Sequence, residues 1–170
     1  MEIIVLRLVH VVGGILWVGA AVFNMLFLAP ALRASGPAAG PVMAALRQRG
    51  LFVFLPVVAL LTILSGTRLM MIVSAGFDAS WFQSTRGSVY AWSGLISIVA
   101  FVLGISVTRP LANKIGALAG QLAQAKDDAA RAALGARLAS AQKWMALTGF
   151  ALTAMLLASA AGMAVARYLA

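Results

Sequence analysis

Four long apolar runs constrain the fold of this 170-residue chain more than any other feature. They cover approximately residues 3–28, 51–75, 89–109 and 144–168, and each can cross about 30 Å of hydrocarbon. Irregular backbone cannot face lipid, so the runs are predicted to be helices. The composition agrees, because 63% of the residues are hydrophobic and 10% are charged, whereas soluble domains are nearer half apolar and a quarter charged. We predict an all-α membrane protein with a single four-helix domain over residues 1–170.

The formal net charge of +9 could suggest a nucleic-acid-binding protein, but the basic residues are concentrated in two connections between the runs. Of the 13 Lys and Arg residues, 3 lie in the connection 29–50 and 6 in the connection 109–143. The positive-inside rule then places both connections in the cytoplasm. We predict an antiparallel bundle in a bacterial inner membrane, with both termini on the periplasmic side, a lipid bilayer around it and no nucleic-acid partner.

The longest connection is predicted to form a helical hairpin. Its first part carries aliphatic residues at spacings of four and three: Leu111, Ile115, Leu118 and Leu122. This spacing is typical of an amphipathic helix, and Asp127 and Asp128 can cap a second helix. We expect a cytoplasmic amphipathic hairpin between the third and fourth spans, with both arms continuous with those spans.

The third and fourth runs also present small residues at spacings of three or four. These are Ser93, Ser97, Ala100, Gly104 and Thr108 in the third run, and Ala151, Met155, Ser159, Gly162 and Ala166 in the fourth. Small residues let helix backbones approach closely in lipid. We therefore predict that these faces pack against neighbouring helices.

The first run, IIVLRLVHVVGGILWVGAAVFNMLFL, holds the only histidine of the chain. His10, Trp17 and Asn24 recur at every seventh residue, and two helical turns cover about 7.2 residues, so these side chains fall on one line. A lipid-facing line would consist of large aliphatic residues, whereas this one is polar or aromatic, with Gly14 beside it. We predict that the line faces protein, and that Pro30 and the turn after it end this helix.

An arginine of the second run lies at the same predicted depth as the histidine. His10 is seven residues inside the first run and Arg68 is seven residues from the end of the second, so antiparallel helices place both in the outer half of the bundle. An ionisable residue inside a span costs roughly 2.5–3.5 kcal/mol on translocon scales and is a functional candidate by default. Two structural alternatives stay open. The histidine could simply hydrogen-bond a neighbouring Ser, Thr or Asn, and the arginine could extend to the outer interface.

Haem is the first cofactor that a single intramembrane histidine suggests, because haem iron accepts one histidine as an axial ligand. His10 would be that ligand. The pair Gly13 and Gly14 would leave room for a flat macrocycle, with Trp17 beside it, and Arg68 or Arg7 could pair with a propionate. These residues form the predicted cofactor-binding site.

Copper is the alternative, with His10, Met70 and Met71 as metal ligands, because thioethers select Cu(I). A proton relay would need a carboxylate inside the membrane. All four acidic residues lie outside the runs: Glu2, Asp78, Asp127 and Asp128. The sequence therefore argues against a proton-driven transporter.

The run L-V-H-V-V-G-G-I-L-W-V-G, followed by F-L-A-P-A-L, resembles the first helix of CopD-like membrane proteins, which include the copper-resistance D domain and related small integral membrane proteins. It is more distantly similar to the first helix of HemJ-type protoporphyrinogen oxidases. The match covers about 30 of the 170 residues. The resemblance implies a helical membrane bundle and, for the HemJ type, b-haem bound through His10. The HemJ type also has a functional lysine in a later span, where this chain has only Arg109 at the edge of its third run.

Two classes of function follow from these observations. The first is a membrane protein of CopD-like type that binds b-haem, or else copper, through His10 in a redox or metal-handling role. The second is a non-catalytic accessory or scaffold subunit of a larger membrane complex or homo-oligomer, in which His10 is a packing residue. The chain contains no nucleophile–base pair or phosphate-binding glycine loop, and its sequence leaves open whether it is an enzyme.

Overall fold

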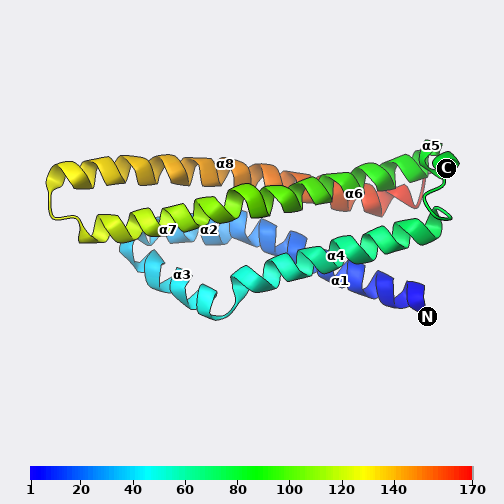
Figure 1. The fold of residues 1–170 in the computed structure, drawn as a ribbon, viewed down its shortest axis with the longest axis horizontal. Coiled ribbons are helices and arrows are strands. Elements are labelled where there is room, and N and C mark those ends of the chain that lie inside the picture. The colour runs from blue at the N-terminus through cyan, green and yellow to red at the C-terminus, as the bar shows by residue number, and fades with distance from the viewer. Residues whose placement is uncertain (170) are drawn as a thin grey trace.

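The computed structural model describes residues 1–169, apart from the side chain of Pro37. Over these residues the chain is all-α, and four helices are long and apolar enough to cross a membrane: Glu2–Ala34, Leu51–Val73, Thr85–Gln124 and Asp128–Ala166. The predicted class is confirmed at this level, since the protein is a multi-pass membrane protein whose environment is a lipid bilayer. Figure 1 shows the four helices side by side along one long axis.

The first long helix ends at Ala34, directly before the predicted turn, and does not end at Pro30, so the prediction was right for the turn and wrong for the proline. α1 (Glu2–Phe23) continues through a π-helical segment, Asn24–Leu28, into α2 (Ala29–Ala34). Pro30 lies in the first turn of α2, and the turn before it, with which a proline ring would clash in an α-helix, is π-helical. The helix therefore passes the proline without breaking.

The π-helical segment also limits the predicted protein-facing line of the first helix. Trp17 is buried and His10 is partly buried, as predicted. Asn24 is exposed, and the π-helical segment begins at this residue. A π-turn holds more residues than an α-turn, so a line drawn for 3.6 residues per turn does not continue through it. The line faces protein at its first two members and not at the third.

A 3₁₀ turn, Gly36–Ala38, and the short helix α3 (Ala39–Gln48) lead into α4 (Leu51–Val73). Gly50 separates α3 from α4 with a φ of 79°, a left-handed conformation that favours glycine. The second long helix therefore starts where the sequence places its apolar run.

The connection from α4 to α6 (Thr85–Leu103) contains one short helix, α5 (Ala79–Gln83). Asp78 caps α5, because its carboxylate accepts hydrogen bonds from the hydroxyl and amide of Ser80 and from the amide of Trp81. These bonds, the Ser80 hydroxyl first among them, lower the pKa of the Asp78 carboxyl. Trp81 also stacks on Tyr90 of α6, with 6.3 Å between ring centroids. The connection is thus held by polar caps and by aromatic contacts.

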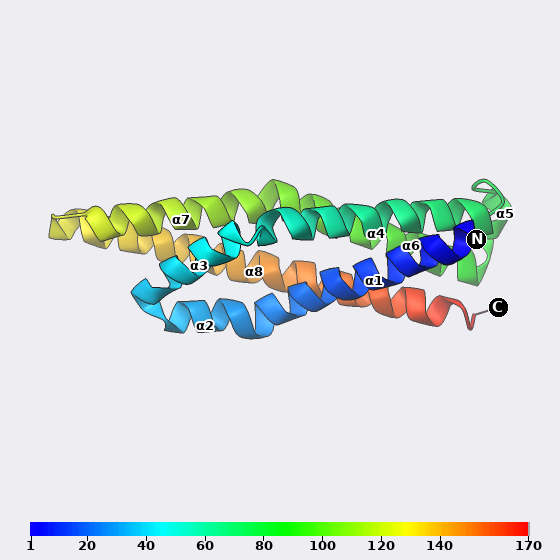
Figure 2. The same cartoon turned by 90° about the horizontal axis from the view of Figure 1, so that it is seen from below.

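The predicted helical hairpin between the third and fourth spans is present, and its cytoplasmic location stays a prediction. α6 continues through a second π-helical segment, Gly104–Thr108, into α7 (Arg109–Gln124), and α8 (Asp128–Ala166) returns beside it. Asp127 caps α8 by accepting a hydrogen bond of 2.9 Å from the Ala130 amide. Figures 1 and 2 show the end of α7 and the beginning of α8 extending beyond α2 and α3. We call this the hairpin end, and the opposite end, where α1 begins and α8 ends, the termini end.

Each long helix has two main neighbours, since α1 and α6 both contact α4 and α8. The core joins all four helices through Trp17, Val58, Ala59, Ala100 and Leu156. The ring of Trp17 meets Phe101 edge-on, with 6.3 Å between centroids and 89° between planes. Trp17 is therefore the aromatic centre of the bundle core.

The small-residue faces of α6 and α8 were predicted to pack against neighbouring helices, and part of each packs against the other, although Ala151 is exposed. The Ser159 hydroxyl of α8 donates a hydrogen bond of 2.7 Å to the Ser93 carbonyl of α6. A Cβ at Gly162 would collide with the Ser93 hydroxyl, so only glycine fits this crossing without movement. The backbones of these two helices can therefore approach closely only because small residues lie at the contact.

Candidate functional site

His10 lies against α4 and its ring is fixed by one hydrogen bond. The ring Nδ1 is 2.8 Å from the backbone carbonyl oxygen of Thr62, and the carbonyl can only accept, so Nδ1 carries the proton. The same carbonyl also accepts a hydrogen bond of 3.1 Å from the Ser65 hydroxyl. The histidine is therefore turned into the protein, as the spacing of the first helix predicted.

This hydrogen bond determines the chemistry of the other ring nitrogen. With the proton on Nδ1, the neutral ring has a free lone pair on Nε2. Nε2 makes no hydrogen bond to any described residue, and no described buried side-chain nitrogen lacks a partner, so Nε2 keeps access to the bundle surface. Metal-ligating histidines usually donate their second ring nitrogen to a carbonyl or carboxylate in this way. His10 thus has the hydrogen bonding of a metal ligand.

Glycines on both helices make the contact around His10 tight. A Cβ at Gly66 would lie 2.6 Å from Cε1 and 2.8 Å from Nδ1 of the His10 ring. A Cβ at Gly13 would collide with the Thr62 hydroxyl, and one at Gly14 would lie 3.9 Å from Thr62 Cγ2. The contact with α4 is therefore closed at Gly13 by Thr62, whereas Gly14 makes only an ordinary contact there, and a groove of about 370 Å³ lies beside Gly13. The expectation that the glycine pair leaves room for a flat macrocycle stays a prediction.

Arg68 lies two residues beyond Gly66 on α4, and its side chain extends toward the start of α1. Its Nε donates to Glu2 Oε1 at 2.7 Å, and Nη1 lies 3.6 Å from the sulfur of Met71. The side chains of Arg68 and Glu2 are 47% and 57% exposed. Arg68 thus forms an exposed ion pair that ties α4 to α1 at the termini end.

The remaining predicted residues do not gather around the imidazole. Trp17 belongs to the core, and the methyl group of Met70 lies 3.4 Å from the position that a Cβ of Gly94 on α6 would take. The Met71 sulfur accepts from Arg68. Within residues 1–169, no group of three or more His, Cys, Asp and Glu side chains could hold a metal ion. The structure therefore joins His10 to Thr62 and Gly66 rather than to the methionines.

The sequence reasoning missed Thr62 and Gly66 as partners of the histidine. Both lie in the run L-T-I-L-S-G-T-R-L and are four residues apart, on one face of α4. Small residues at this spacing are typical of close helix contacts in membranes. That signal could have identified the face of α4 on which His10 packs.

Comparison with known proteins adds no assignment, because no family model, curated protein or solved structure matches the chain. The likeness of the first helix to CopD-like and HemJ-type proteins therefore stays a prediction. The function of the protein is therefore inferred from the geometry around His10.

Proposed function

We propose that this multi-pass membrane protein binds b-type haem, with Nε2 of His10 as an axial ligand, in a redox or metal-handling role. One observation carries the proposal: the Nδ1–H of His10 donates to the Thr62 carbonyl and leaves the Nε2 lone pair free. Bound haem would supply one-electron chemistry. The chain would hold the ligand ring in one tautomer and one orientation.

Whether haem fits this site depends on the donor chemistry of His10 and on the space around it. The donor chemistry of His10 suits haem iron. Thr62 closes the space between Gly13 and α4, whereas a groove of about 370 Å³ stays open beside Gly13. His10 would therefore hold such a group from outside the contact between α1 and α4. Arg68 is the candidate partner for a propionate, since its side chain is 47% exposed and its present partner, Glu2, is also a carboxylate.

We also propose that the hairpin end is cytoplasmic and that the protein lies in a bacterial inner membrane. The basic residues support this orientation, because 9 of the 13 Lys and Arg residues lie in the connections at the hairpin end. The site would then lie in the periplasmic half of the bundle. Both termini would be periplasmic.

Copper is a weaker form of the same proposal. It would use the same free nitrogen of His10, but the sulfur of Met71 contacts Arg68 and the methyl group of Met70 packs toward α6. Soft ligands for Cu(I) would have to move toward the imidazole.

A second candidate function is supported by the tight packing. The His10 ring fills the space beside Gly66, and its Nδ1 bridges to the Thr62 carbonyl, which is also what a structural histidine does. In that case the protein would be an accessory subunit of a larger membrane complex. Its exposed helix faces would contact partner subunits.

Absorption spectroscopy separates these functions. Protein purified in mild detergent from haem-replete cells is expected to show a Soret band, and His10→Ala is expected to lose it. Ser159→Ala is the matched control, because it removes another side-chain-to-carbonyl hydrogen bond between helices without removing a nitrogen ligand. That variant should keep the band.

A colourless and metal-free wild-type preparation would overturn both the haem and the copper forms. Copper found by metal analysis without a Soret band would favour the copper form. Co-purification of a stoichiometric partner that His10→Ala leaves unchanged, from a colourless preparation, would establish the accessory role instead.

A further inference from the structure

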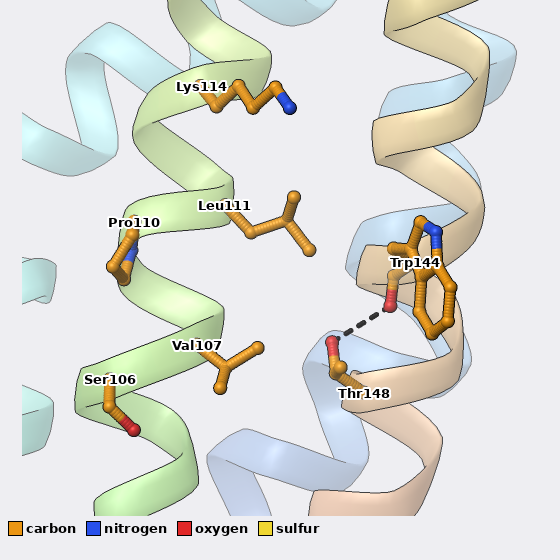
Figure 3. A pocket seen from close by; sticks show the side chains of 7 residues that line it. All are labelled: Ser106, Val107, Pro110, Leu111, Lys114, Trp144 and Thr148. Atoms are coloured by element: carbon orange, nitrogen blue, oxygen red, sulfur yellow. Dashed lines mark hydrogen bonds between the residues drawn. The ribbon is translucent and has the colours of Figure 1, made fainter.

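A shallow groove of about 380 Å³ lies at the hairpin end, far along the chain from His10. One wall comes from the second π-helical segment and the start of α7, and the other comes from α8. Figure 3 shows Val107 and Leu111 facing the Trp144 side of α8, with Lys114 above them. The groove is open toward the surroundings of the bundle, where the hairpin leaves the other helices.

The groove surface is apolar along most of its length. The two hydroxyl groups in it are already bonded to backbone, because Ser106 donates to the Val102 carbonyl at 2.6 Å and Thr148 donates to the Trp144 carbonyl at 2.9 Å. The Trp144 side chain is 61% exposed and lies across the groove. An occupant would therefore meet hydrocarbon and an indole ring, with no free hydroxyl group in the apolar part.

One end of the groove differs, because it carries a positive charge. Lys114 is the one charged residue of the lining, it is exposed, and it has no ion-pair partner among residues 1–169. It lies one to two turns along α7 from the apolar wall, on the side toward the hairpin. Arg109 and Lys143 adjoin the groove in sequence. The groove thus changes along its axis from an apolar channel to a basic end.

The groove also coincides with an irregularity of the helix. The segment Gly104–Thr108 is π-helical, and the Thr108 hydroxyl lies 3.5 Å from the Leu103 carbonyl, five residues back. π-helical turns inside α-helices occur frequently at functional sites. Ser106 and Val107 of this segment line the groove.

We propose that this groove binds one phospholipid with an anionic headgroup. An acyl chain would lie along Val107 and Leu111 under the Trp144 ring, and the headgroup phosphate would contact the Lys114 ammonium. The charge pattern fits this occupant, because tryptophan is typical of the membrane–water interface and a lysine beyond it attracts anionic lipid. The site is independent of His10 and of the haem proposal.

Native mass spectrometry of the full chain tests the charge part of the site. The protein is released from detergent containing equal amounts of phosphatidylglycerol and phosphatidylcholine. Wild type is expected to retain one phosphatidylglycerol preferentially. Lys114→Gln should reduce its retention about fivefold, as expected for one lysine near an anionic lipid surface. The matched control is Lys126→Gln, which removes the same charge from an exposed position in the hairpin turn and should change nothing.

A second variant, Val107→Trp, tests the apolar part by filling the groove. It should reduce retention of both lipids, while circular dichroism shows an unchanged helix content. Equal losses in Lys114→Gln and Lys126→Gln would overturn the proposal, because the effect would then be bulk charge. Lipid retention unaffected by Val107→Trp would also overturn it, and so would a second copy or a partner protein that Val107→Trp displaces without changing lipid retention.

Discussion

The bundle contains two helix pairs, α1 with α4 and α6 with α8, that are built in the same way. In each pair a glycine on one helix packs against a hydroxyl on the other: Gly13 against Thr62, and Gly162 against Ser93. In each pair a side chain also bonds a backbone carbonyl across the crossing. The two crossings therefore solve the same packing problem in lipid, with close backbones and one polar bridge.

The similarity extends to the first helix of each pair. The π-helical segment Asn24–Leu28 is followed by Pro30, and the segment Gly104–Thr108 is followed by Pro110. In both cases the proline is the second residue after the segment, and the helix continues through it. The same local device thus carries both helices past a residue that would break a regular α-helix.

The two pairs differ in the side chain that forms the polar bridge. Between α6 and α8 the Ser159 hydroxyl reaches the Ser93 carbonyl at 2.7 Å, whereas between α1 and α4 the ring of His10 reaches the Thr62 carbonyl at 2.8 Å. A serine is therefore sufficient for the bridge, and a histidine adds a second nitrogen that packing does not need. This surplus nitrogen is the physical basis for treating His10 as a ligand.

The largest expected effects concern the two glycine crossings. Gly13→Ala and Gly162→Ala should each lower the free energy of unfolding by about 1–3 kcal/mol, because the added methyl group collides with a hydroxyl. Thr62→Ala should rescue the first variant and Ser93→Ala the second, since the Cβ atoms of these partners would lie 3.6 Å from the new methyl groups. Unfolding in SDS, measured as two double-mutant cycles, gives both coupling energies.

Two other glycines serve as controls for these cycles. A Cβ at Gly19 of α1 or at Gly149 of α8 would meet nothing within 4 Å. Alanine at these positions should therefore leave stability unchanged or slightly raise it, through its better helix propensity. If the double-mutant cycle of one helix pair gave no coupling energy, the two crossings would not be equivalent.

The second prediction concerns Gly66 and Ala166. Gly66 lies four residues after Thr62 on α4, and Ala166 lies four residues after Gly162 on α8. At Gly66 a methyl group would displace the His10 ring, whereas the corresponding Ala166 has a methyl group that is fully buried. Gly66→Ala is expected to lower the free energy of unfolding by about 1–2 kcal/mol and to change the spectrum of any metal bound at Nε2. Ala166→Gly should cost about 1 kcal/mol and leave that spectrum unchanged.

Both variants should be destabilised, but only Gly66→Ala should change the spectrum, and this difference would sharpen the distinction between the pairs. The measurements are thermal unfolding in detergent and visible absorption. If Gly66→Ala left both the stability and the spectrum as in wild type, the imidazole would not be held where the hydrogen bond places it.

The sequence alone predicted the features that depend on local pattern. Apolar runs predicted the four long helices, and the spacing of Leu111, Leu118 and their neighbours, with Asp127 as a cap, predicted the hairpin. Leu118 is indeed buried, and Asp127 does cap α8. These features were predictable because each depends on residues within a few turns of one another.

Features that depend on how two helices are aligned could not be predicted in the same way. His10 and Arg68 were expected to share a site because of their similar depth, but the length of the arginine side chain allows it to reach Glu2 instead. Thr62 and Gly66 became identifiable as partners only once α1 and α4 were docked. Side-chain reach and the register between helices decide these contacts, and neither follows from spacing within one helix.

The smallest expected effect concerns one arginine of each helix pair, which forms a hydrogen bond at the termini end. Arg68 of α4 donates to the Glu2 carboxylate at 2.7 Å, and Arg86 of α6 donates through Nε to the Leu169 carbonyl at 3.1 Å. Arg68→Gln should lower the free energy of unfolding by about 0–1 kcal/mol, since the pair is half exposed. Salt should weaken the Arg68 contact, because both partners are charged, and should affect the Arg86 contact much less.

Unfolding of Arg68→Gln and Arg86→Gln at low and high ionic strength measures this difference. The stability gap between wild type and Arg68→Gln should shrink as salt is added, whereas the gap for Arg86→Gln should stay nearly constant. Glu2→Gln should reproduce the salt dependence of Arg68→Gln, because it removes the other half of the same pair. A gap for Arg68→Gln that exceeds 1 kcal/mol and does not respond to salt would mean that this guanidinium is buried at the His10 site rather than paired with Glu2 at the surface.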